Sequence, residues 1–510
     1  MTAAIITRNG DEVTVQITMK LTGSMLDMET TIQSAVNEGG ALATREALTK
    51  FDATGAPIKI AGITLTSKGK VIKEYQTPYG AFMLERYVYQ TCNGGETFCP
   101  LDDRARIITS STPKLAQMIS DKYASLTAQE VADDLTNNHS RKTTHKFVQH
   151  LADMVGSIAQ ATEEAWDYEI PTQVEPIASI SVSLDGTCML MRAINKDDPV
   201  SRATNKNQLI TEFKIKISKV TTDVDIFSKI KDNLNFDGPK PDCISKKIIK
   251  KITTGEIDNL DALLDNMHTP EPGGYREAMT GNISLYNLDG ERMHTIYLGA
   301  TPEYGKAIFL SRLQNEVDKI KSKYPDATYV GIADGAANNW EFLTPNTQYQ
   351  ILDFYHATEY LAGASYAFFT EDVKRKVWLH NICHELKHTE NAAQTILIQM
   401  EEQFNQIKDK KKISDVIKKK LNAAITYFTN QLSRMNYFDY RAKNLPIGSG
   451  VTEAACKTLI KQRLCRSGMR WKDRGARVVI ALRALAQTTG RWTQFWDRIA
   501  QNGICDLMVA

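Results

Sequence analysis

The chain has 510 residues, enough for several domains, and its 42% hydrophobic and 24% charged residues are typical of a soluble globular protein. Its 62 basic and 60 acidic residues nearly cancel, so the net charge of +2 indicates no partner. The scattered cysteines argue against a secreted disulfide framework and favour a reducing cytosol. Because no signal peptide or apolar span is recognisable, we expect a cytoplasmic protein with no membrane partner.

The first 110 residues predict a helical segment and then a small β unit. LTGSMLDMETTIQSAVNEGG predicts helix within residues 1–56, and alternating residues in 57–110 predict strands broken by turns. Cys92 and Cys99 flank a Gly-Gly turn, as in half of a zinc site. No second Cys/His pair follows at suitable spacing, so a β unit without a metal is favoured.

Residues 111–170 predict helices joined by a short polar connection. The second helix is expected to bear Arg141, Lys142, His145 and Lys146, which resembles the outline of a helix-turn-helix. Arg141, Lys142 and Lys146 are therefore candidate DNA contacts. A helical hairpin with a solvated basic face has the same pattern, and both interpretations stay open.

Residues 171–345 predict an α/β layer. PIASISVSLDGTCMLM is a buried β run, a hairpin turns at Asp289-Gly290, and ATYVGIADGAANNW is a second buried strand after a helix. Residues 194–271 are polar and lysine-rich, and they predict an inserted segment with its own small fold or partial order.

Residues 346–445 show the 3.6-residue helical period throughout, and 446–510 continue with a turn and basic helices. His380, Cys383, His384 and His388 share one predicted helix, and the three histidines lie on one face. A zinc site and a packing or surface face are both compatible with that spacing, and the packing face is favoured.

Two of the four Asp-Gly pairs in the chain are candidates for chemistry. Those at Asp237 and Asp289 are explained as turns, whereas Asp185 and Asp334 are predicted to end apolar strands of a covered sheet. Functional groups gather at such strand ends, where paired carboxylates could share divalent cations. Glu453, in the first turn of a helix, is a candidate third ligand, although an acid there also suits the helix dipole.

The segment after Glu453 is strongly basic. It has ten Lys/Arg and a single acid, Asp473, between Lys457 and Arg491. Such a strip can neutralise phosphates, and an aromatic among the charges can stack on an unpaired base. The alternative is a solvated helix face, which usually carries both signs. The candidate DNA contacts are Lys457, Lys461, Arg463, Arg466, Arg470, Trp471, Lys472 and Arg474.

Several blocks, in this order, resemble bacterial insertion-sequence transposases of the ISKra type, which are D-D-E transposases distantly related to Mutator-like enzymes. The blocks are VSLDGTCML, YLGATPEYGKA, YVGIADGAANNW, ILDFYHATEYL and LPIGSGVTEAACKTLIKQRLCRSGMRW. The resemblance covers most of 57–193 and 272–505. It implies an RNase H-like core with a helical insertion before the last acid.

The resemblance also implies roles for individual residues. Asp185, Asp334 and Glu453 would be the three acids that hold two Mg²⁺ or Mn²⁺ ions, and His356, in Asp353-x-x-His356, would support the active site. The partners would be terminal inverted repeats and target DNA in the bacterial nucleoid, bound by at least a dimer. The segment 194–271 departs from the family pattern. A DNA-binding protein that no longer catalyses and a nuclease without strand transfer therefore remain alternatives.

Overall fold

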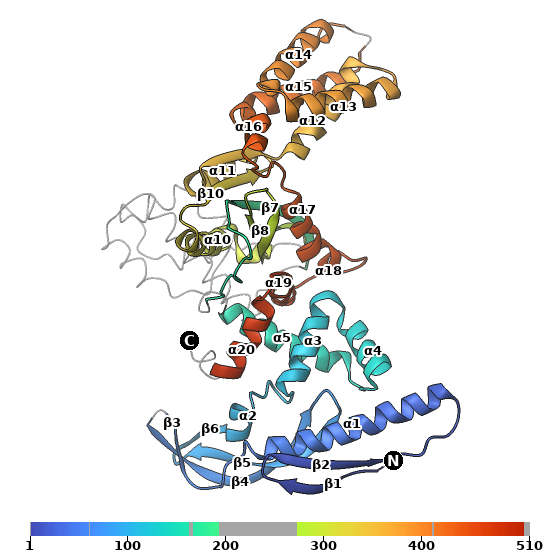
Figure 1. Ribbon diagram of the computed structural model, residues 1–510, viewed down its shortest axis with the longest axis vertical. Coiled ribbons are helices and arrows are strands. Elements are labelled where there is room, and N and C mark those ends of the chain that lie inside the picture. Colours follow the sequence, from blue (N-terminus) through green and yellow to red (C-terminus); the bar gives the residue numbers. More distant parts are fainter. Residues whose placement is uncertain (1, 61, 163–166, 193–272, 411–412, 504–510) are drawn as a thin grey trace. The chain divides into compact units, whose positions relative to one another are not determined.

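The computed structural model describes residues 2–60, 62–162, 167–192, 273–410 and 413–503 (Figure 1). The predicted insertion at 194–271 lies outside these residues. The fold is mixed α/β with three separate sheets, which confirms the predicted class. Two compact units divide the chain, the first made of Met1–Ile170, Arg477–Ala486 and Gly490–Ala510, the second of Pro171–Ala476 and Gln487–Thr489.

The first unit begins with a hairpin and a long helix. Strands β1 (Thr2–Asn9) and β2 (Glu12–Thr18) pair antiparallel around Gly10, and α1 spans Met25–Thr49. Gly10 has a φ of 59°, which suits the tight two-residue connection. The prediction of a helical segment over 1–56 is therefore wrong for residues 2–18. Helix α1 begins at a capping box in which Ser24 and Asp27 bind each other's backbone N–H.

A four-stranded antiparallel sheet follows, and it confirms the strands predicted within 57–110. Its order is β3-β4-β5-β6, and a short helix, α2, comes directly after β6. Leu48 of α1 is buried with Tyr75, Leu84 and Leu101, so helix and sheet share one core. The bounds are β3 Ile58–Ile60, β4 Ile63–Gln76, β5 Ala81–Thr91, β6 Gly94–Phe98 and α2 Pro100–Arg104.

The first unit is completed by helices, α3 (Pro113–Ser125), α4 (Ala128–His139), α5 (His145–Thr162) and α20 (Arg491–Asn502). Helix α19 (Asp473–Gln487) contributes its residues 477–486 to this unit. There Val478 packs against Gly156 of α5, and the Arg483 guanidinium donates to the Ala124 carbonyl. A side chain at position 156 would collide with Val478, which explains the glycine.

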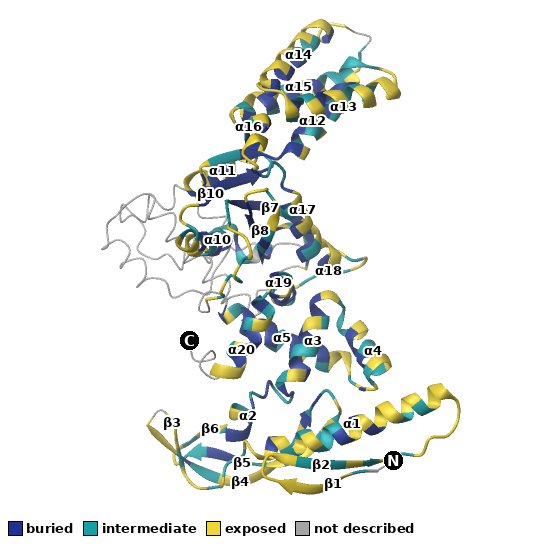
Figure 2. Cartoon of the chain, in the orientation of Figure 1, coloured by how far each residue is buried: buried dark blue, intermediate teal, exposed yellow. Residues whose placement is uncertain are grey.

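The second unit is built on a five-stranded sheet in the order β11-β10-β7-β8-β9. Strand β8 runs antiparallel to both of its neighbours, β7 and β9, whereas β10 and β11 run parallel to β7. The central strands are almost wholly buried (Figure 2). The bounds are β7 Ser179–Met191, β8 Gly274–Tyr286, β9 Arg292–Ala300, β10 Thr328–Ala333 and β11 Tyr349–Leu352.

Helices connect and cover these strands. A 3₁₀ turn (Pro302–Tyr304) and α10 (Lys306–Lys323) join β9 to β10, and α11 (Ala337–Leu343) with a second 3₁₀ turn (Thr344–Asn346) joins β10 to β11. After β11 comes a long run of helices, named here the helical segment: α12 Phe354–Phe368, α13 Asp372–His388, α14 Ala392–Ile407, α15 Asp415–Gln431, the 3₁₀ turn Leu432–Arg434 and α16 Tyr437–Ala442 (Figure 1).

The helical segment begins and ends at the same place. The Phe354 N–H, at its start, donates to the Ile447 carbonyl at 3.0 Å, just after its end. The chain then continues through α17 (Gly450–Ala455), a π-helical turn (Cys456–Lys461) and α18 (Gln462–Leu464). Among the described residues, no helix has both the length and the apolar character to span a membrane.

Candidate active site

Asp185 and Asp334 lie on neighbouring strands. Strand β10 pairs with β7 in parallel register, with Ile332 opposite Ser183. Asp334 directly follows the last residue of β10, two positions after Ile332, and Asp185 comes two positions after Ser183 in β7, so the two acids come at the same level of the sheet. The Asp334 carboxylate raises the pKa of Asp185, which agrees with this proximity. The Asp-Gly sequence predicts that Asp185 ends its strand, and this prediction is wrong. Asp185 lies in the middle of β7, opposite Thr280 of β8.

Gly186 lies within strand β7 and not in a turn. A Cβ at position 186 would lie 2.2 Å from Oε1 of Glu277 on the neighbouring strand β8, so a larger residue would displace that exposed side chain. The Gly186 N–H donates to Oδ1 of Asp185 at 2.7 Å, which holds the carboxyl group close to its own backbone. This backbone bond orients the acid.

The surroundings of the Asp185 carboxyl group disfavour its ionised state. Burial raises its pKa above the ordinary aspartate value, and the nearby Asp334 carboxylate raises it further. The Gly186 N–H, the Cys456 thiol and His356 act in the opposite direction. The two carboxylates are close together, and one of them resists ionisation. A bound cation would offset the repulsion between their charges.

Asp334 is held at the end of β10 by groups from two helical regions. Its Oδ1 accepts from the Ala336 N–H at 3.1 Å and from Asn339 Nδ2 of α11 at 3.4 Å. Its backbone carbonyl accepts from the Tyr427 hydroxyl of α15 at 2.6 Å. Gln431, also on α15, donates to the next carbonyl, that of Gly335, at 3.1 Å. The helical segment thus fixes the loop that carries this acid.

Helix α17 lies on the same face of the sheet as the two aspartates. Asn282 of β8, opposite Ser183, donates to Thr452 Oγ1 at 2.7 Å. One turn later, Cys456 Sγ is 2.9 Å from Thr280 Oγ1 and 3.5 Å from Asp185 Oδ2. Burial raises the pKa of the Cys456 thiol to about 12, so it stays protonated and can donate to the Asp185 carboxylate.

Glu453 is next to this contact but exposed. It lies three residues before Cys456, so the two side chains are neighbours on the helix surface. Within the described parts of the chain, no three His, Cys, Asp or Glu side chains are grouped closely enough to hold a metal ion. The structure therefore brings Asp185 and Asp334 together and places the helix of Glu453 beside them, without gathering three ligands.

The Asp353-x-x-His356 motif connects β11 to the turn before Glu453. The Asp353 carboxylate is fully buried and accepts from the Tyr355 and His356 N–H groups at 2.6 and 3.2 Å, which caps α12. Its other oxygen accepts from both the N–H and the hydroxyl of Ser449. The turn that precedes α17 is thus attached to the start of the helical segment by one carboxylate.

His356 is half-buried in α12, with Nδ1 3.6 Å from the Glu359 carboxylate. A protonated His356 would lower the pKa of Asp185, so the imidazole lies within electrostatic range of that acid. His356 also lines an open cavity of about 670 Å³ in the helical segment, together with Tyr360, Tyr366, Arg375 and Lys420.

The predicted basic strip is only partly available to a partner. Arg463 is fully buried, and its guanidinium lies 5.3 Å from the centre of the Trp471 ring. The Trp471 indole donates to the Leu464 carbonyl at 2.9 Å. The prediction of Arg463 as a phosphate contact is therefore wrong, because its side chain is buried. Trp471 is half-buried, and its role as a base-stacking residue stays a prediction. Arg466 is half-buried, and the exposed members are Lys457, Lys461, Arg470, Lys472 and Arg474.

Arg141 is also misassigned by the sequence pattern. Both Arg141 and Lys142 precede α5, and the Arg141 guanidinium is buried, donating to the carbonyls of Thr77 and Lys142 and to the Gln76 side chain. Arg141 thus ties the helices to the β unit and cannot contact DNA in this position. Lys142 and Lys146 are exposed.

The structure also describes the two sets of residues considered as zinc ligands, the Cys92/Cys99 pair and the His/Cys set on α13. Cys92 is exposed and Cys99 half-buried. On α13, the rings of His384 and His388 stack 4.4 Å apart at the surface. Burial raises the pKa of the Cys383 thiol to about 11, which disfavours the thiolate that a metal requires. These contacts agree with a surface and packing role.

The sequence analysis did not identify four residues that contact the candidate site: Thr452, Cys456, Tyr427 and Asn339. The position of Cys456, one helical turn after Glu453, could have identified it, and Thr452 is the residue directly before Glu453. Tyr427 carries no such signal, because its contact with Asp334 spans 93 residues of sequence.

Replacing Tyr427 with phenylalanine tests whether the helical segment positions Asp334. The change removes only the hydroxyl that donates to the Asp334 carbonyl, so we expect the free energy of unfolding to fall by about 1 kcal/mol. Urea unfolding measures that loss. Tyr360→Phe is the matched control, because Tyr360 stacks on the Tyr427 ring at 3.9 Å and is more exposed. Equal stability of the two variants would contradict the positioning role.

Comparison of the chain with protein-family models and with curated proteins found no match.

Proposed function

We propose that the protein is a DNA transposase that cuts and joins DNA strands in a metal-dependent reaction. The observation that carries this proposal is the adjacency of Asp185 and Asp334 on β7 and β10, with α17 attached beside them through Cys456. Paired carboxylates on one sheet face are the usual ligands for the divalent ions of phosphodiester chemistry. The order of the acids along the chain agrees with the sequence resemblance to D-D-E transposases.

The sheet topology supports an RNase H-like core. Three antiparallel strands, β7 to β9, are followed by β10 and β11, which extend the sheet on the other side of β7 in parallel orientation. The helical segment leaves after β11 and returns at Ile447, as an insertion before the third acid would. We infer that this insertion separates the second and third acids in the sequence without separating their elements in the fold.

The donor set fits divalent cations. Asp185 and Asp334 offer carboxylate oxygens on one face, and Glu453 lies on the adjacent helix surface, from where a side-chain rotation can bring its carboxylate nearer. Two bound Mg²⁺ or Mn²⁺ ions supply an activated oxygen nucleophile and neutralise charge on the phosphodiester. The chain's own groups hold the acids in place: Gly186 and Cys456 at Asp185, Asn339 and the helical segment at Asp334.

The exposed cations Lys457, Lys461, Arg470, Lys472 and Arg474 follow the third acid and suit contacts with DNA phosphates. In the first unit, the exposed Lys142 and Lys146 suit binding of the terminal inverted repeats. Because two element ends must be joined, the active species is proposed to be at least a dimer.

The proposal is tested with purified protein, DNA that carries the element's ends, and Mg²⁺. We expect the wild type to cut at the ends and join them to target DNA, and Glu453→Gln to lose both activities by about a hundredfold or more. Glu291→Gln is the matched control, because Glu291 is an exposed glutamate in the β8–β9 turn of the same unit. The control is expected to act like the wild type.

Each other outcome identifies an alternative. Cut ends without joined products would indicate a nuclease that lacks strand transfer. Specific binding without metal-dependent cleavage would indicate a DNA-binding protein that no longer catalyses. Full activity of Glu453→Gln would show that Glu453 is not the third acid.

A further inference from the structure

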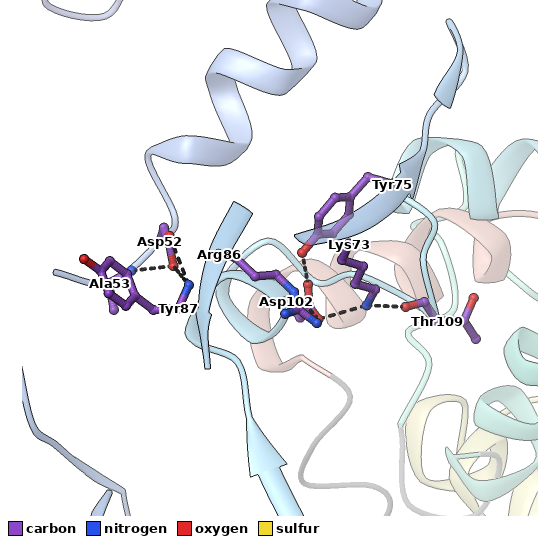
Figure 3. Close-up of polar contacts among 8 residues, drawn as sticks. All are labelled: Asp52, Ala53, Lys73, Tyr75, Arg86, Tyr87, Asp102 and Thr109. Atoms are coloured by element: carbon purple, nitrogen blue, oxygen red, sulfur yellow. Dashed lines mark hydrogen bonds and ion pairs between the residues drawn. The ribbon is translucent and has the colours of Figure 1, made fainter. Parts of the chain in front are cut away.

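A half-buried ionic cluster in the first unit has no part in the proposed transposition chemistry. The Asp102 carboxylate, on α2, accepts from Lys73 Nζ at 2.9 Å and from the Tyr75 hydroxyl at 2.5 Å (Figure 3). Arg86 Nε of β5 is 3.5 Å from Asp102 Oδ2. Burial and Asp102 raise the pKa of the Tyr75 phenol, so it is neutral. Two cations and one carboxylate leave the cluster with a net positive charge.

The Arg86 guanidinium is the unsatisfied member of the cluster. Its side chain is 12% exposed, and its ion pair with Asp102 is too poorly aligned to be a hydrogen bond. Within the described residues, its Nε and Nη1 are buried without a hydrogen-bond partner, and so is the hydroxyl of Thr109. Buried donors without acceptors are costly, and a charged donor more so. An acceptor that brings negative charge would satisfy both residues.

These unsatisfied groups line one cavity of about 460 Å³, formed by β5, β6, the 99–109 region and α5. The apolar part of its wall includes Val88, Phe98, Ile108, Met154 and Ile158. The wall also contains Asp103 and Arg106, whose opposite charges are paired at 3.8 Å, so the Asp103 carboxylate is offset by its own cation. A volume of this size is in the ~300–1,000 Å³ range of small-molecule sites.

The backbone beside the cluster is held in an unusual conformation. Thr109 has a φ of 59°, which is rare for a β-branched residue. Its carbonyl accepts from Lys73 Nζ at 2.7 Å, so the same ammonium group contacts both Asp102 and this loop (Figure 3). Such strained residues gather at ligand sites because the surrounding structure over-determines them.

We propose that this cavity binds a small amphipathic anion, with its oxyanion group on Arg86 and Thr109 and its apolar body against Phe98, Met154 and Ile158. The planar guanidinium suits bidentate binding of a carboxylate or phosphate. The Cys99 thiol, which also lines the cavity, adds no negative charge, because burial raises its pKa. The site does not depend on the proposed DNA chemistry, since every residue in it belongs to the first unit.

The full-length protein is titrated by calorimetry with probes that separate the head group from the body. 1-Naphthyl phosphate and 1-naphthoate carry both parts and distinguish a phosphate ligand from a carboxylate ligand. 1-Naphthol carries the body alone, and inorganic phosphate the head group alone. We expect saturable binding of one molecule per chain for at least one anionic naphthyl probe, and binding at least about tenfold weaker for naphthol and inorganic phosphate.

Two variants test the site from its two ends. Arg86→Met keeps the side-chain volume and leaves Asp102 paired with Lys73, and it is expected to weaken binding at least about tenfold. Met154→Trp fills the apolar part and is expected to abolish binding while keeping Arg86. Arg45→Met, at an exposed position on α1, is the matched control and should bind as the wild type does.

Circular dichroism confirms that each variant is folded. If Arg86→Met does not fold, Arg86→Lys serves in its place, since it keeps the charge but loses the bidentate geometry. The proposal is overturned if neither anionic probe binds with a stoichiometry of one, if naphthol binds as well as the anions, or if the folded Arg86 and Met154 variants bind as the wild type does.

Discussion

Asp353→Ala is expected to lower the free energy of unfolding by about 3 kcal/mol, the largest stability effect of any substitution discussed here. The buried carboxylate caps α12 and accepts from the Ser449 N–H and hydroxyl, so its removal leaves buried donors without acceptors. A lost helix cap costs about 1 kcal/mol, and the charge-assisted bonds from Ser449 account for the rest. Urea unfolding monitored by circular dichroism measures the loss.

Asp415→Ala is the matched control, because Asp415 is an exposed acid in the first turn of α15 and should change stability by no more than about 0.5 kcal/mol. Ser449→Ala removes one donor and is expected to cost about 1 kcal/mol. The two effects should not add in the double variant, since both residues form one contact. If Asp353→Ala were no less stable than Asp415→Ala, the carboxylate would not hold the turn before Glu453.

Much of the fold is predictable from local pattern. The strands of the 57–110 unit and the β8–β9 hairpin alternate apolar and polar residues, and helices α14 and α15 of the helical segment show the helical period clearly. The β1–β2 hairpin was missed although β2, EVTVQIT, alternates apolar and polar residues and its burial follows the same alternation. That alternation spans only seven residues, and the longer helical pattern of α1 was extended over the whole segment.

The site is less predictable, because its decisive contacts join distant parts of the chain. Asp185-Gly186 predicts a turn locally, yet both residues lie within β7, paired with β8. Arg463 belongs by charge to the basic strip but is buried against Trp471. The three candidate acids were proposed from the order of the sequence blocks. The pairing of Asp185 with Asp334 follows only from the register of β7 and β10.

Asp185→Asn is expected to have opposite effects on activity and stability. Activity should fall about a thousandfold or more, because an amide is a poor replacement for a metal-binding carboxylate and several kcal/mol of charge stabilisation is lost. Stability without metal should rise at neutral pH, because the substitution removes a buried charge next to Asp334. Strand cleavage assays and urea unfolding in the presence of a chelator measure the two effects.

The pH dependence of this stability difference follows from the sign of the pKa shift. Because the pKa of Asp185 is raised in the folded protein, the native state binds more protons than the unfolded state between the two pKa values. Wild-type stability therefore falls as pH rises from about 4, the ordinary aspartate pKa, through the raised value. The advantage of Asp185→Asn should be absent at the lower end of this window and complete above it.

Added Mg²⁺ provides the reciprocal measurement. A ligand that binds only the native state stabilises it, so Mg²⁺ should raise the melting temperature of the wild type and leave Asp185→Asn nearly unchanged. Asp289→Asn is the matched control, because it changes another Asp-Gly pair, in the exposed β8–β9 turn. It should keep the activity, pH dependence and Mg²⁺ response of the wild type. If Asp185→Asn instead destabilised the metal-free protein at neutral pH, the Asp185 carboxylate would stabilise the fold. Its charge would then not be the unfavourable one that a cation site implies.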